Sequence, residues 1–160
     1  MRLILEGPDC AGKSTMAKEL AERLGLDIIK STYYGPKYKS AYVKHLECHD
    51  VVIDRCWISE VIYSKYFVRR SEVDDFTDRT LCDICIKRNI PIVVMLPPID
   101  VIIKRMMDRG DDFYSVVSPN VQAIYKDYVD YCAARPFIHV FRDYNPSKLV
   151  DFLLKNDLDR

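Results

Sequence analysis

Residues 7 to 15 read Gly7-Pro8-Asp9-Cys10-Ala11-Gly12-Lys13-Ser14-Thr15 and directly follow the apolar run Leu3-Ile4-Leu5. The stretch fits Gly-x-x-x-x-Gly-Lys-[Ser/Thr] without a gap, the pattern of a phosphate-binding loop. Gly7 and Gly12 let successive backbone N–H groups turn inward around phosphate oxygens. Lys13 neutralises the outer phosphates, and the Ser14 hydroxyl is offered to Mg²⁺. We therefore expect residues 7–15 to bind the phosphates of ATP and Lys13 to be catalytic.

The flanking sequence matches the setting that such a loop requires. A short apolar strand over residues 2–6 comes before it. After it, apolar residues recur at helical spacing from Met16 to Leu24, and Gly25 follows as a stop. A chance match in a surface turn would lack both the strand before the loop and the helix after it. Binding of a nucleoside triphosphate is thus the first functional prediction.

The remaining elements alternate between apolar runs and helical periods. The runs predict strands over residues 2–6, 27–30, 51–54, 90–96 and 137–141, with helices between them. The run over residues 90–96 is apolar at nearly every position, as in a strand buried on both faces of a parallel sheet. Ser118-Pro119 and Asn145-Pro146 each resemble a helix N-cap followed by proline. The pattern predicts a three-layer α/β domain with a five-stranded parallel sheet and helices on both faces.

The length and composition of the chain exclude several classes of function. The 160 residues suffice for one domain, expected over residues 1–160. Lysine and arginine number 24, as do aspartate and glutamate, and this zero net charge argues against binding to nucleic acid or an anionic membrane through bulk electrostatics. Neither a signal peptide nor a run of membrane-spanning length is evident, so we expect a cytoplasmic protein.

The six cysteines are expected to be reduced thiols in such a protein. Cys82 and Cys85 have the spacing of half a zinc site, but they lack a second pair and continue one face of a helix. We therefore expect no metal held by cysteine. The expected cofactor is Mg²⁺ bound together with ATP.

A second motif stands at the end of the third expected strand. Asp54-Arg55 ends that run, and Ser59 and Tyr63 follow at the start of a helix. Strand C-termini in parallel sheets face the ligand crevice. There Asp54 can bind Mg²⁺ or its water together with Ser14, and Arg55 can bind a second anionic group. The alternative is an ordinary surface ion pair.

Together the two motifs resemble the thymidylate kinase group of nucleoside monophosphate kinases, a P-loop kinase family. The resemblance covers about residues 2–24 and 51–67. It implies that Asp9 binds the acceptor sugar, that Arg55 contacts the acceptor phosphate, and that Ser59 and Tyr63 line the acceptor pocket. It also implies a homodimer and a short lid over about residues 105–118, in which Arg105 and Arg109 are catalytic.

The chain departs from this family in three places. Cys10 stands where many relatives have arginine, which places more of the charge stabilisation on Arg105 and Arg109. The helix expected over residues 38–49 is shorter than the family's base-binding segment and leaves the choice of base open. The family's phosphate-binding arginine after the second strand is also absent, and Lys37, with Lys30 and Lys39 as alternatives, is expected to replace it in acceptor binding.

These features predict phosphorylation of a deoxynucleoside monophosphate, dTMP or another, to its diphosphate by ATP. The main alternative is a deoxynucleoside kinase, which requires a carboxylate base near the end of the second strand. No carboxylate lies between Lys30 and Val43, although Glu60 could act as a displaced base. A nucleotide-binding module without catalysis is the third alternative.

Overall fold

Five parallel strands form one sheet in the computed structural model, which describes residues 1–32, 38–67, 71, 73–109 and 117–158. The strand order across the sheet is β2-β3-β1-β4-β5. The strands are β1 (Arg2–Glu6), β2 (Asp27–Lys30), β3 (Val51–Asp54), β4 (Ile92–Met95) and β5 (His139–Phe141). The first three coincide with the strands expected from the apolar runs.

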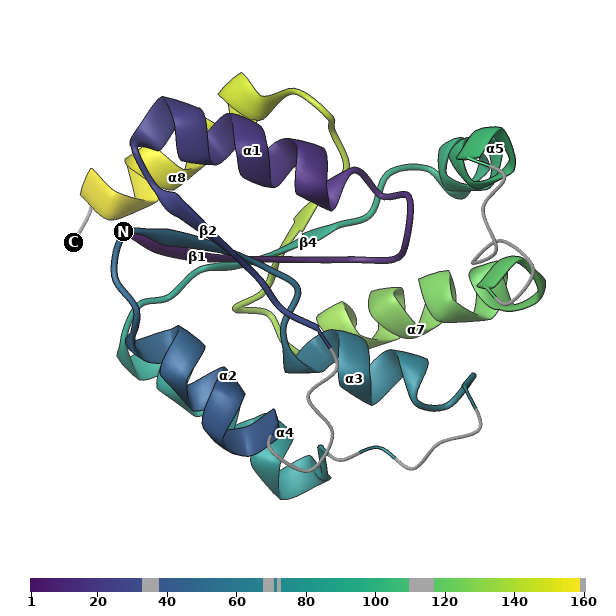
Figure 1. The fold of residues 1–160 in the computed structure, drawn as a ribbon, viewed down its shortest axis with the longest axis horizontal. Helices are drawn as coiled ribbons and strands as arrows, with labels where there is room; N and C mark the ends of the chain where they lie inside the picture. The colour runs from purple at the N-terminus through teal and green to yellow at the C-terminus, as the bar shows by residue number, and fades with distance from the viewer. Residues whose placement is uncertain (33–37, 68–70, 72, 110–116, 159–160) are drawn as a thin grey trace.

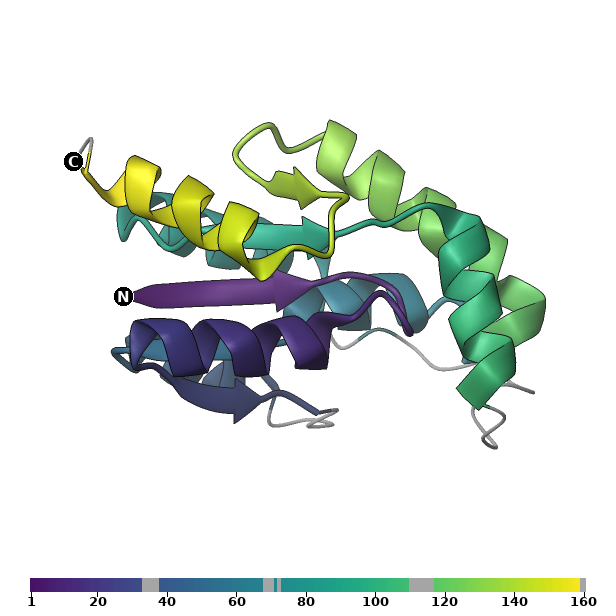
Figure 2. The same cartoon turned by 90° about the horizontal axis from the view of Figure 1, so that it is seen from above.

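The helices lie on both faces of this sheet (Figure 1). Helices α1 (Lys13–Leu24) and α8 (Pro146–Leu158) cover one face. The other face carries α2 (Tyr38–Glu47), α3 (Trp57–Tyr63), α4 (Asp75–Lys87) and α7 (Val121–Ala133). Helix α5 (Ile99–Arg109) lies beyond the end of the strands (Figure 2). The three-layer α/β fold expected from the sequence is confirmed.

The core explains why β1, β3 and β4 occupy the centre of the sheet. Every residue of β3 and β4 is buried, as apolar runs of this kind require for strands covered on both faces. Leu5 of β1 lies opposite Asp54 of β3 on one side and Val93 of β4 on the other. This register brings the loop after β1 beside the Asp54-Arg55 pair at the end of β3.

Some expected boundaries are wrong for local reasons. Strand β4 begins at Ile92 and not at residue 90, because Pro91 has no N–H to donate to a sheet ladder. Strand β2 has the expected bounds, but it lies at the sheet edge, where Ile28 is 43% exposed. Helix α2 ends at Glu47, before His49.

Of the two helix N-caps expected before prolines, the structure has one. Asn145 caps α8, since its Oδ1 accepts a hydrogen bond of 3.0 Å from the backbone N–H of Ser147. Ser118 does not cap α7. Together with Pro119 it forms a short 3-10 helix, Ser118–Asn120, and α7 starts after it without a side-chain cap.

All six cysteines are free thiols. Cys82 and Cys85 are buried on α4, as the helical pattern predicts. Within the described residues no group of three or more His, Cys, Asp or Glu side chains has a geometry that could hold a metal ion. The described helices include none with the length and apolar character needed to cross a membrane.

Candidate active site

The loop between β1 and α1 has a backbone that only glycine can satisfy at two positions. Gly7 has φ 138°, and a Cβ there would lie 2.4 Å from the carbonyl oxygen of Met95. Gly12 has φ 90°, and its Cβ would lie 2.9 Å from the Tyr144 ring. Both glycines of the motif are therefore fixed by the left-handed backbone and by close neighbours.

Lys13 begins α1 and points back into this loop. Its residue is only 5% exposed, and Nζ donates a hydrogen bond of 2.6 Å to the Pro8 carbonyl oxygen. Burial, together with the nearby charge of Arg55, lowers the Lys13 pKa to about 7. The loop thus holds a desolvated ammonium whose charge depends on an anionic partner.

Ser14 and Asp54 come from α1 and β3 and meet through a hydrogen bond of 2.7 Å from Ser14 Oγ to Asp54 Oδ2. The other carboxylate oxygen of Asp54 is buried and has no hydrogen-bond partner among the described residues. A hydroxyl and a carboxylate with an open, buried oxygen are the hard oxygen donors that Mg²⁺ prefers. The pair therefore fits the magnesium role expected from the sequence.

A cavity of about 590 Å³ opens over the loop and is lined by its residues. Two arginines of α5, Arg105 and Arg109, also line it. The described residues that line it are Asp9, Cys10, Gly12, Lys13, Ser14, Thr15, Met16, Lys30, Asp54, Arg55, Arg105, Arg109, Tyr144 and Pro146. We name it the donor cavity. Among the described residues, its wall combines backbone N–H groups of the loop over residues 7–15 with five cationic side chains.

Arg105 lies over the ring of Tyr144, a residue that the sequence interpretation did not include in the site. Its guanidinium carbon is 3.8 Å from the centre of the Tyr144 ring, and Nη1 lies 3.5 Å from the Cys10 carbonyl oxygen. Tyr144 comes from the segment between β5 and α8. A cation–π contact of this kind holds the arginine over the loop at Gly12.

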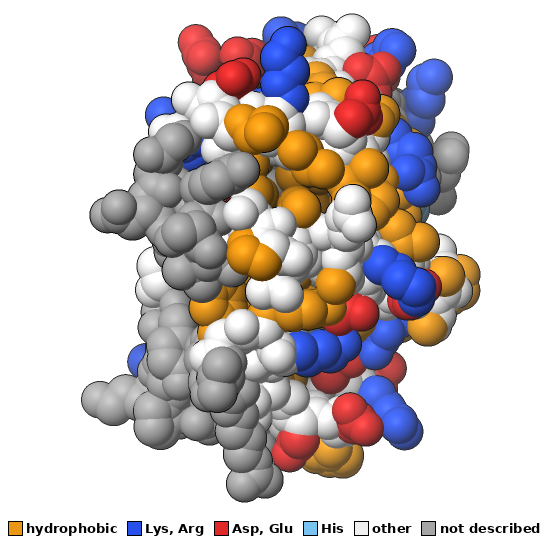
Figure 3. All heavy atoms as spheres, turned by 90° about the vertical axis from the view of Figure 1, so that its right-hand side faces the viewer, with side chains coloured by type: hydrophobic (Ala, Val, Ile, Leu, Met, Phe, Trp, Pro, Cys, Tyr) orange, Lys and Arg blue, Asp and Glu red, His pale blue; other side chains and the backbone are white. Residues whose placement is uncertain are grey.

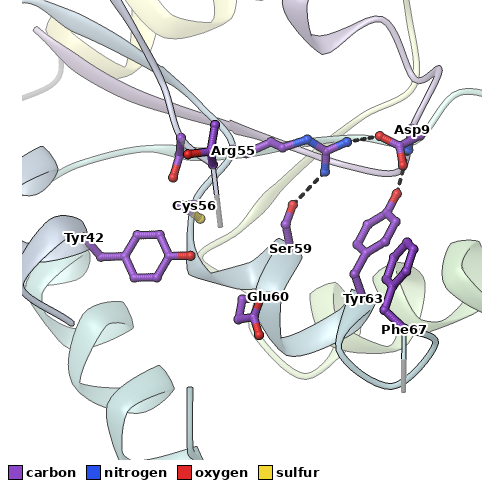
Figure 4. A pocket seen from close by; sticks show the side chains of 10 residues that line it. Asp9, Tyr42, Arg55, Cys56, Ser59, Glu60, Tyr63 and Phe67 are labelled. Atoms are coloured by element: carbon purple, nitrogen blue, oxygen red, sulfur yellow. Dashed lines mark hydrogen bonds and ion pairs between the residues drawn. The ribbon is translucent and has the colours of Figure 1, made fainter. Parts of the chain in front are cut away.

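A second cavity of about 230 Å³ adjoins the first (Figure 4). We name it the acceptor cavity. It is lined by Asp9, Ser31, Thr32, Tyr42, Arg55, Cys56, Ser59, Glu60, Tyr63 and Phe67. Asp9 and Arg55 line both cavities. The expected acceptor residues Asp9, Arg55, Ser59 and Tyr63 are thus brought together in one pocket.

Arg55 stands at the boundary between the two cavities in a left-handed backbone conformation, φ 74°. Its guanidinium forms an ion pair with Asp9 and donates a hydrogen bond of 2.9 Å to Ser59 Oγ (Figure 4). It also lies 5.5 Å from the centre of the Tyr63 ring. Burial opposes its charge, but the Asp9 carboxylate and other neighbours outweigh burial and raise the Arg55 pKa.

Tyr63 connects the acceptor cavity to the phosphate loop. Its hydroxyl oxygen accepts a hydrogen bond of 2.8 Å from the backbone N–H of Asp9. Burial and the Asp9 carboxylate raise the Tyr63 pKa, so the phenol stays neutral. The ring also stacks against Phe67, with 5.9 Å between ring centres.

Glu6 is a residue of the site that the sequence interpretation missed. It ends β1, is fully buried, and accepts hydrogen bonds from backbone N–H groups of Gly7, Cys56 and Ser59. Its Oε2 also accepts from Ser59 Oγ at 2.8 Å and from the Tyr128 hydroxyl at 3.1 Å. One signal was present: a charged residue ending an otherwise apolar strand needs partners in the core.

Some expected residues are not brought to the acceptor cavity. Lys30 lines the donor cavity instead. Lys37 lies outside the described residues, as do residues 110–116 of the expected lid.

A third cavity of about 380 Å³ lies between α5 and α7 and is lined by Ile103, Met106, Ser118, Pro119, Val121 and Gln122. The face drawn in Figure 3 shows hydrophobic side chains gathered between charged ones on this side of the molecule.

The chain matches none of the models of known protein families. It is 33% identical over 117 residues to the uncharacterized SPbeta prophage-derived protein YorR of Bacillus subtilis strain 168, a match spanning 69% of this chain and 70% of YorR. A crystal structure of YorR in complex with phosphorylated GDP superimposes with a TM-score of 0.83 at 25% identity, covering 100% of this chain and 99% of YorR.

Two structures named as kinases share the fold at lower identity. Deoxyadenosine kinase from M. mycoides with bound dCTP gives a TM-score of 0.62 at 18% identity, with 99% of each chain covered. Shikimate kinase from Acinetobacter baumannii in complex with shikimate gives 0.64 at 16% identity, covering 98% of this chain and 94% of that one. The chain has the P-loop kinase fold and belongs to the same protein family as YorR of Bacillus subtilis.

Proposed function

We propose that this protein transfers the terminal phosphoryl group of ATP to a nucleoside monophosphate. The observation that carries the proposal is the shared wall of the two cavities, formed by Asp9 and Arg55. A phosphotransferase has to bring two anionic substrates together at one point, and a cation at that point stabilises both. A mere nucleotide binder needs only the donor cavity.

On the donor side, the loop amides and Lys13 would bind the outer phosphates of ATP. Ser14 and Asp54 would hold Mg²⁺, which when bound neutralises charge on those phosphates. The Lys13 ammonium is buried within the loop, which destabilises its positive charge. The negative phosphates of bound ATP would stabilise that charge.

The transfer itself requires little more than alignment and charge stabilisation. An oxygen of the acceptor phosphate forms a bond to the terminal phosphorus of ATP while the bond to the bridging oxygen breaks. ADP and a nucleoside diphosphate are the products. Arg105 and Arg109 line the donor cavity from α5 and would stabilise the charge that spreads over the transferring group.

The identity of the acceptor group follows from the charges around the acceptor cavity. Arg55 suits an acceptor that already carries a phosphate, because a guanidinium binds such oxyanions in a fork geometry. The end of β2 and the residues after it, Lys30-Ser31-Thr32, offer no carboxylate that could deprotonate a hydroxyl. Asp9 and Tyr63 would contact the sugar. YorR holds phosphorylated GDP in its crystal structure, which supports nucleotide binding, and a deoxynucleoside monophosphate such as dTMP fits the resemblance.

A deoxynucleoside kinase is the second candidate, because Glu60 lines the acceptor cavity and a deoxyadenosine kinase shares the fold. A general base must reach the hydroxyl that attacks the donor phosphate, near Arg55. Figure 4 shows the Glu60 side chain on the far side of Ser59 from the Arg55 guanidinium. This placement favours a nucleoside monophosphate over a free nucleoside as the acceptor.

The test is a panel of ribo- and deoxynucleoside monophosphates and the matching free nucleosides, with ATP and Mg²⁺, scored by ADP release. We expect turnover with at least one monophosphate and little with its nucleoside. Faster phosphorylation of free nucleosides would replace the proposal with the second candidate. Binding of ATP without turnover of any acceptor would favour a module that only binds.

A further inference from the structure

Glu60 has no role in the transfer proposed above, yet it is a charged residue in the wall of the acceptor cavity. It is only 4% exposed and lies on α3, one residue after Ser59. A buried carboxylate requires hydrogen-bond donors around it, because its desolvation is costly. Its location invites the question of which part of the acceptor it faces.

The position of Glu60 relative to Arg55 answers this question. Arg55 and Asp9 form the end of the acceptor cavity that joins the donor cavity. Successive residues of a helix point about 100° apart. Ser59 points to Arg55 and Glu60 therefore points elsewhere, away from the guanidinium (Figure 4). A nucleotide with its phosphate at Arg55 would extend its base toward Glu60.

We propose that Glu60 reads the base of the acceptor and selects guanine, an inference that rests on the proposed function as a monophosphate kinase. An ionised carboxylate only accepts hydrogen bonds, through two oxygens with about four acceptor positions. It can thus accept from the protein and from a base together. The Watson–Crick edge of guanine presents two adjacent donors, N1–H and the 2-amino group, which match the two oxygens of a carboxylate.

The other bases match a carboxylate less well. The N3–H of thymine lies between two carbonyl oxygens, which repel the carboxylate. The amino groups of adenine and cytosine each stand beside a ring nitrogen that is itself an acceptor. Each of these bases offers one donor and at least one acceptor to the carboxylate, so the mismatch leaves polar groups without partners.

The other described residues of the cavity do not supply this selectivity. The charged residues in the part of the lining that the structure describes are Asp9, Arg55 and Glu60, and the first two form an ion pair with each other. Tyr42 and Phe67 provide aromatic surface, which packs against any base because every base has a π-face. Tyr42 is itself held edge-on against Trp57, with ring centres 6.4 Å apart. Among these residues, Glu60 is therefore the one whose side chain can discriminate between bases.

The experiment measures kcat/KM for the monophosphates of guanine, hypoxanthine, adenine, cytosine and thymine with ATP as the constant donor. We expect the guanine nucleotide to lead by at least about tenfold, with hypoxanthine second because it keeps N1–H but lacks the 2-amino group. In Glu60→Gln the ratio of guanine to adenine should fall by about 10–100-fold. Glu22→Gln, an exposed glutamate on α1, is the matched control and should keep the wild-type ranking.

The outcomes separate this inference from the function on which it rests. If monophosphates are substrates but guanine does not lead, or Glu60→Gln keeps the wild-type ranking, the inference is overturned and the kinase proposal stands. If only free nucleosides react, and Glu60→Gln abolishes turnover with all of them, Glu60 is a general base and both proposals fail. Should Glu60→Gln not fold, the wild-type order of guanine, hypoxanthine and adenine nucleotides still decides the question.

Discussion

Glu6 and Ser59 are joined by two hydrogen bonds at the centre of the site. Glu6 Oε1 accepts from the Ser59 backbone N–H at 3.1 Å, and Oε2 accepts from Ser59 Oγ at 2.8 Å. Ser59 Oγ in turn accepts from the Arg55 guanidinium. The buried carboxylate at the end of β1 therefore sets the start of α3 and, through one hydroxyl, the position of Arg55.

Replacing Glu6 by glutamine should destabilise the protein although the shape of the side chain is kept. The amide would replace one oxygen by an N–H₂ donor, which would then face donors: the backbone N–H of Gly7 at the Oε2 position or that of Cys56 at the Oε1 position. We expect the free energy of unfolding, measured by urea denaturation, to fall by about 2–4 kcal/mol. Glu22→Gln on the exposed side of α1 serves as the control. A stability equal to wild type would mean that Glu6 does not organise the site.

Binding of ADP or ATP should weaken as the pH rises above neutrality. In the free protein the Lys13 pKa is lowered to about 7, so the ammonium that attracts phosphate is progressively lost above that pH. Bound phosphates favour the charged form and raise the pKa again. By linkage, the dissociation constant should increase about tenfold between pH 7 and pH 8.5.

The matched variant for this measurement is Lys13→Met, whose side chain is unbranched, one heavy atom shorter than lysine and without a titratable group. It should bind nucleotide weakly at every pH and show no phosphoryl transfer. Its dissociation constant should not rise further above pH 7. Isothermal titration at several pH values checks both proteins. A wild-type dissociation constant that stays level from pH 6.5 to 8.5 would contradict the burial argument for Lys13.

Asp54→Asn should raise the Mg²⁺ concentration that half-saturates the reaction. The carboxylate orients the Ser14 hydroxyl and keeps a buried oxygen open, and an amide can replace only part of this. Partners of this kind typically contribute a factor of about 10–100 in metal affinity or activity. Activity is titrated with Mg²⁺ at fixed ATP, with the exposed Asp83→Asn on α4 as control. An unchanged Mg²⁺ titration would remove Asp54 from the metal role.

Arg105→Ala should lower kcat by up to about 10³-fold while changing the KM for either substrate much less. Cys10 leaves the loop without an arginine, so under the proposed function Arg105 and Arg109, which line the donor cavity from α5, would stabilise the transferring group. Arg109→Ala provides the comparison within the same helix, and Arg79→Ala, at an exposed position of α4, is the neutral control. Wild-type kcat in both α5 variants would show that another residue stabilises the charge.

The fold, the phosphate-binding loop and the Asp54-Arg55 pair could be predicted because their sequence signals are local. The glycines at positions 7 and 12 are needed by the backbone itself, and an apolar run before the loop identifies β1. The pair Asp54-Arg55 was predicted to face the loop because parallel strands end at one edge of a sheet. Its lateral pairing with Leu5 confirms that reasoning.

What could not be predicted depends on contacts between distant segments. Tyr144 lies 39 positions after Arg105, and no sequence pattern links an arginine of one helix to the ring that holds it. Glu6 gave a weak signal, but its partners Ser59 and Tyr128 come from two other helices. The ion pair between Asp9 and Arg55 likewise exists only once β1 and β3 are adjacent. Tertiary packing decides each of these contacts.

Arg55→Ala is the substitution that tests the shared wall of the two cavities. If Arg55 binds the acceptor phosphate in a desolvated crevice, its loss leaves that anion unpaired and should cost about 2–4 kcal/mol in kcat/KM for the monophosphate. The dissociation constant for ATP should change less, because the loop amides, Lys13 and Ser14 remain. Ser59→Ala removes one hydrogen bond to the guanidinium and should have a smaller effect in the same direction.

Two comparisons make the Arg55 result decisive. Arg23→Ala removes a guanidinium on the exposed side of α1, where it pairs with Glu19, and should leave kcat/KM at the wild-type value. Free nucleosides should be poor substrates for wild type and Arg55→Ala alike, since they carry no phosphate for Arg55 to bind. Equal losses for monophosphate and nucleoside would instead show that Arg55 acts on the donor phosphates, and the acceptor phosphate would then need another cation, such as Lys30 in the donor cavity.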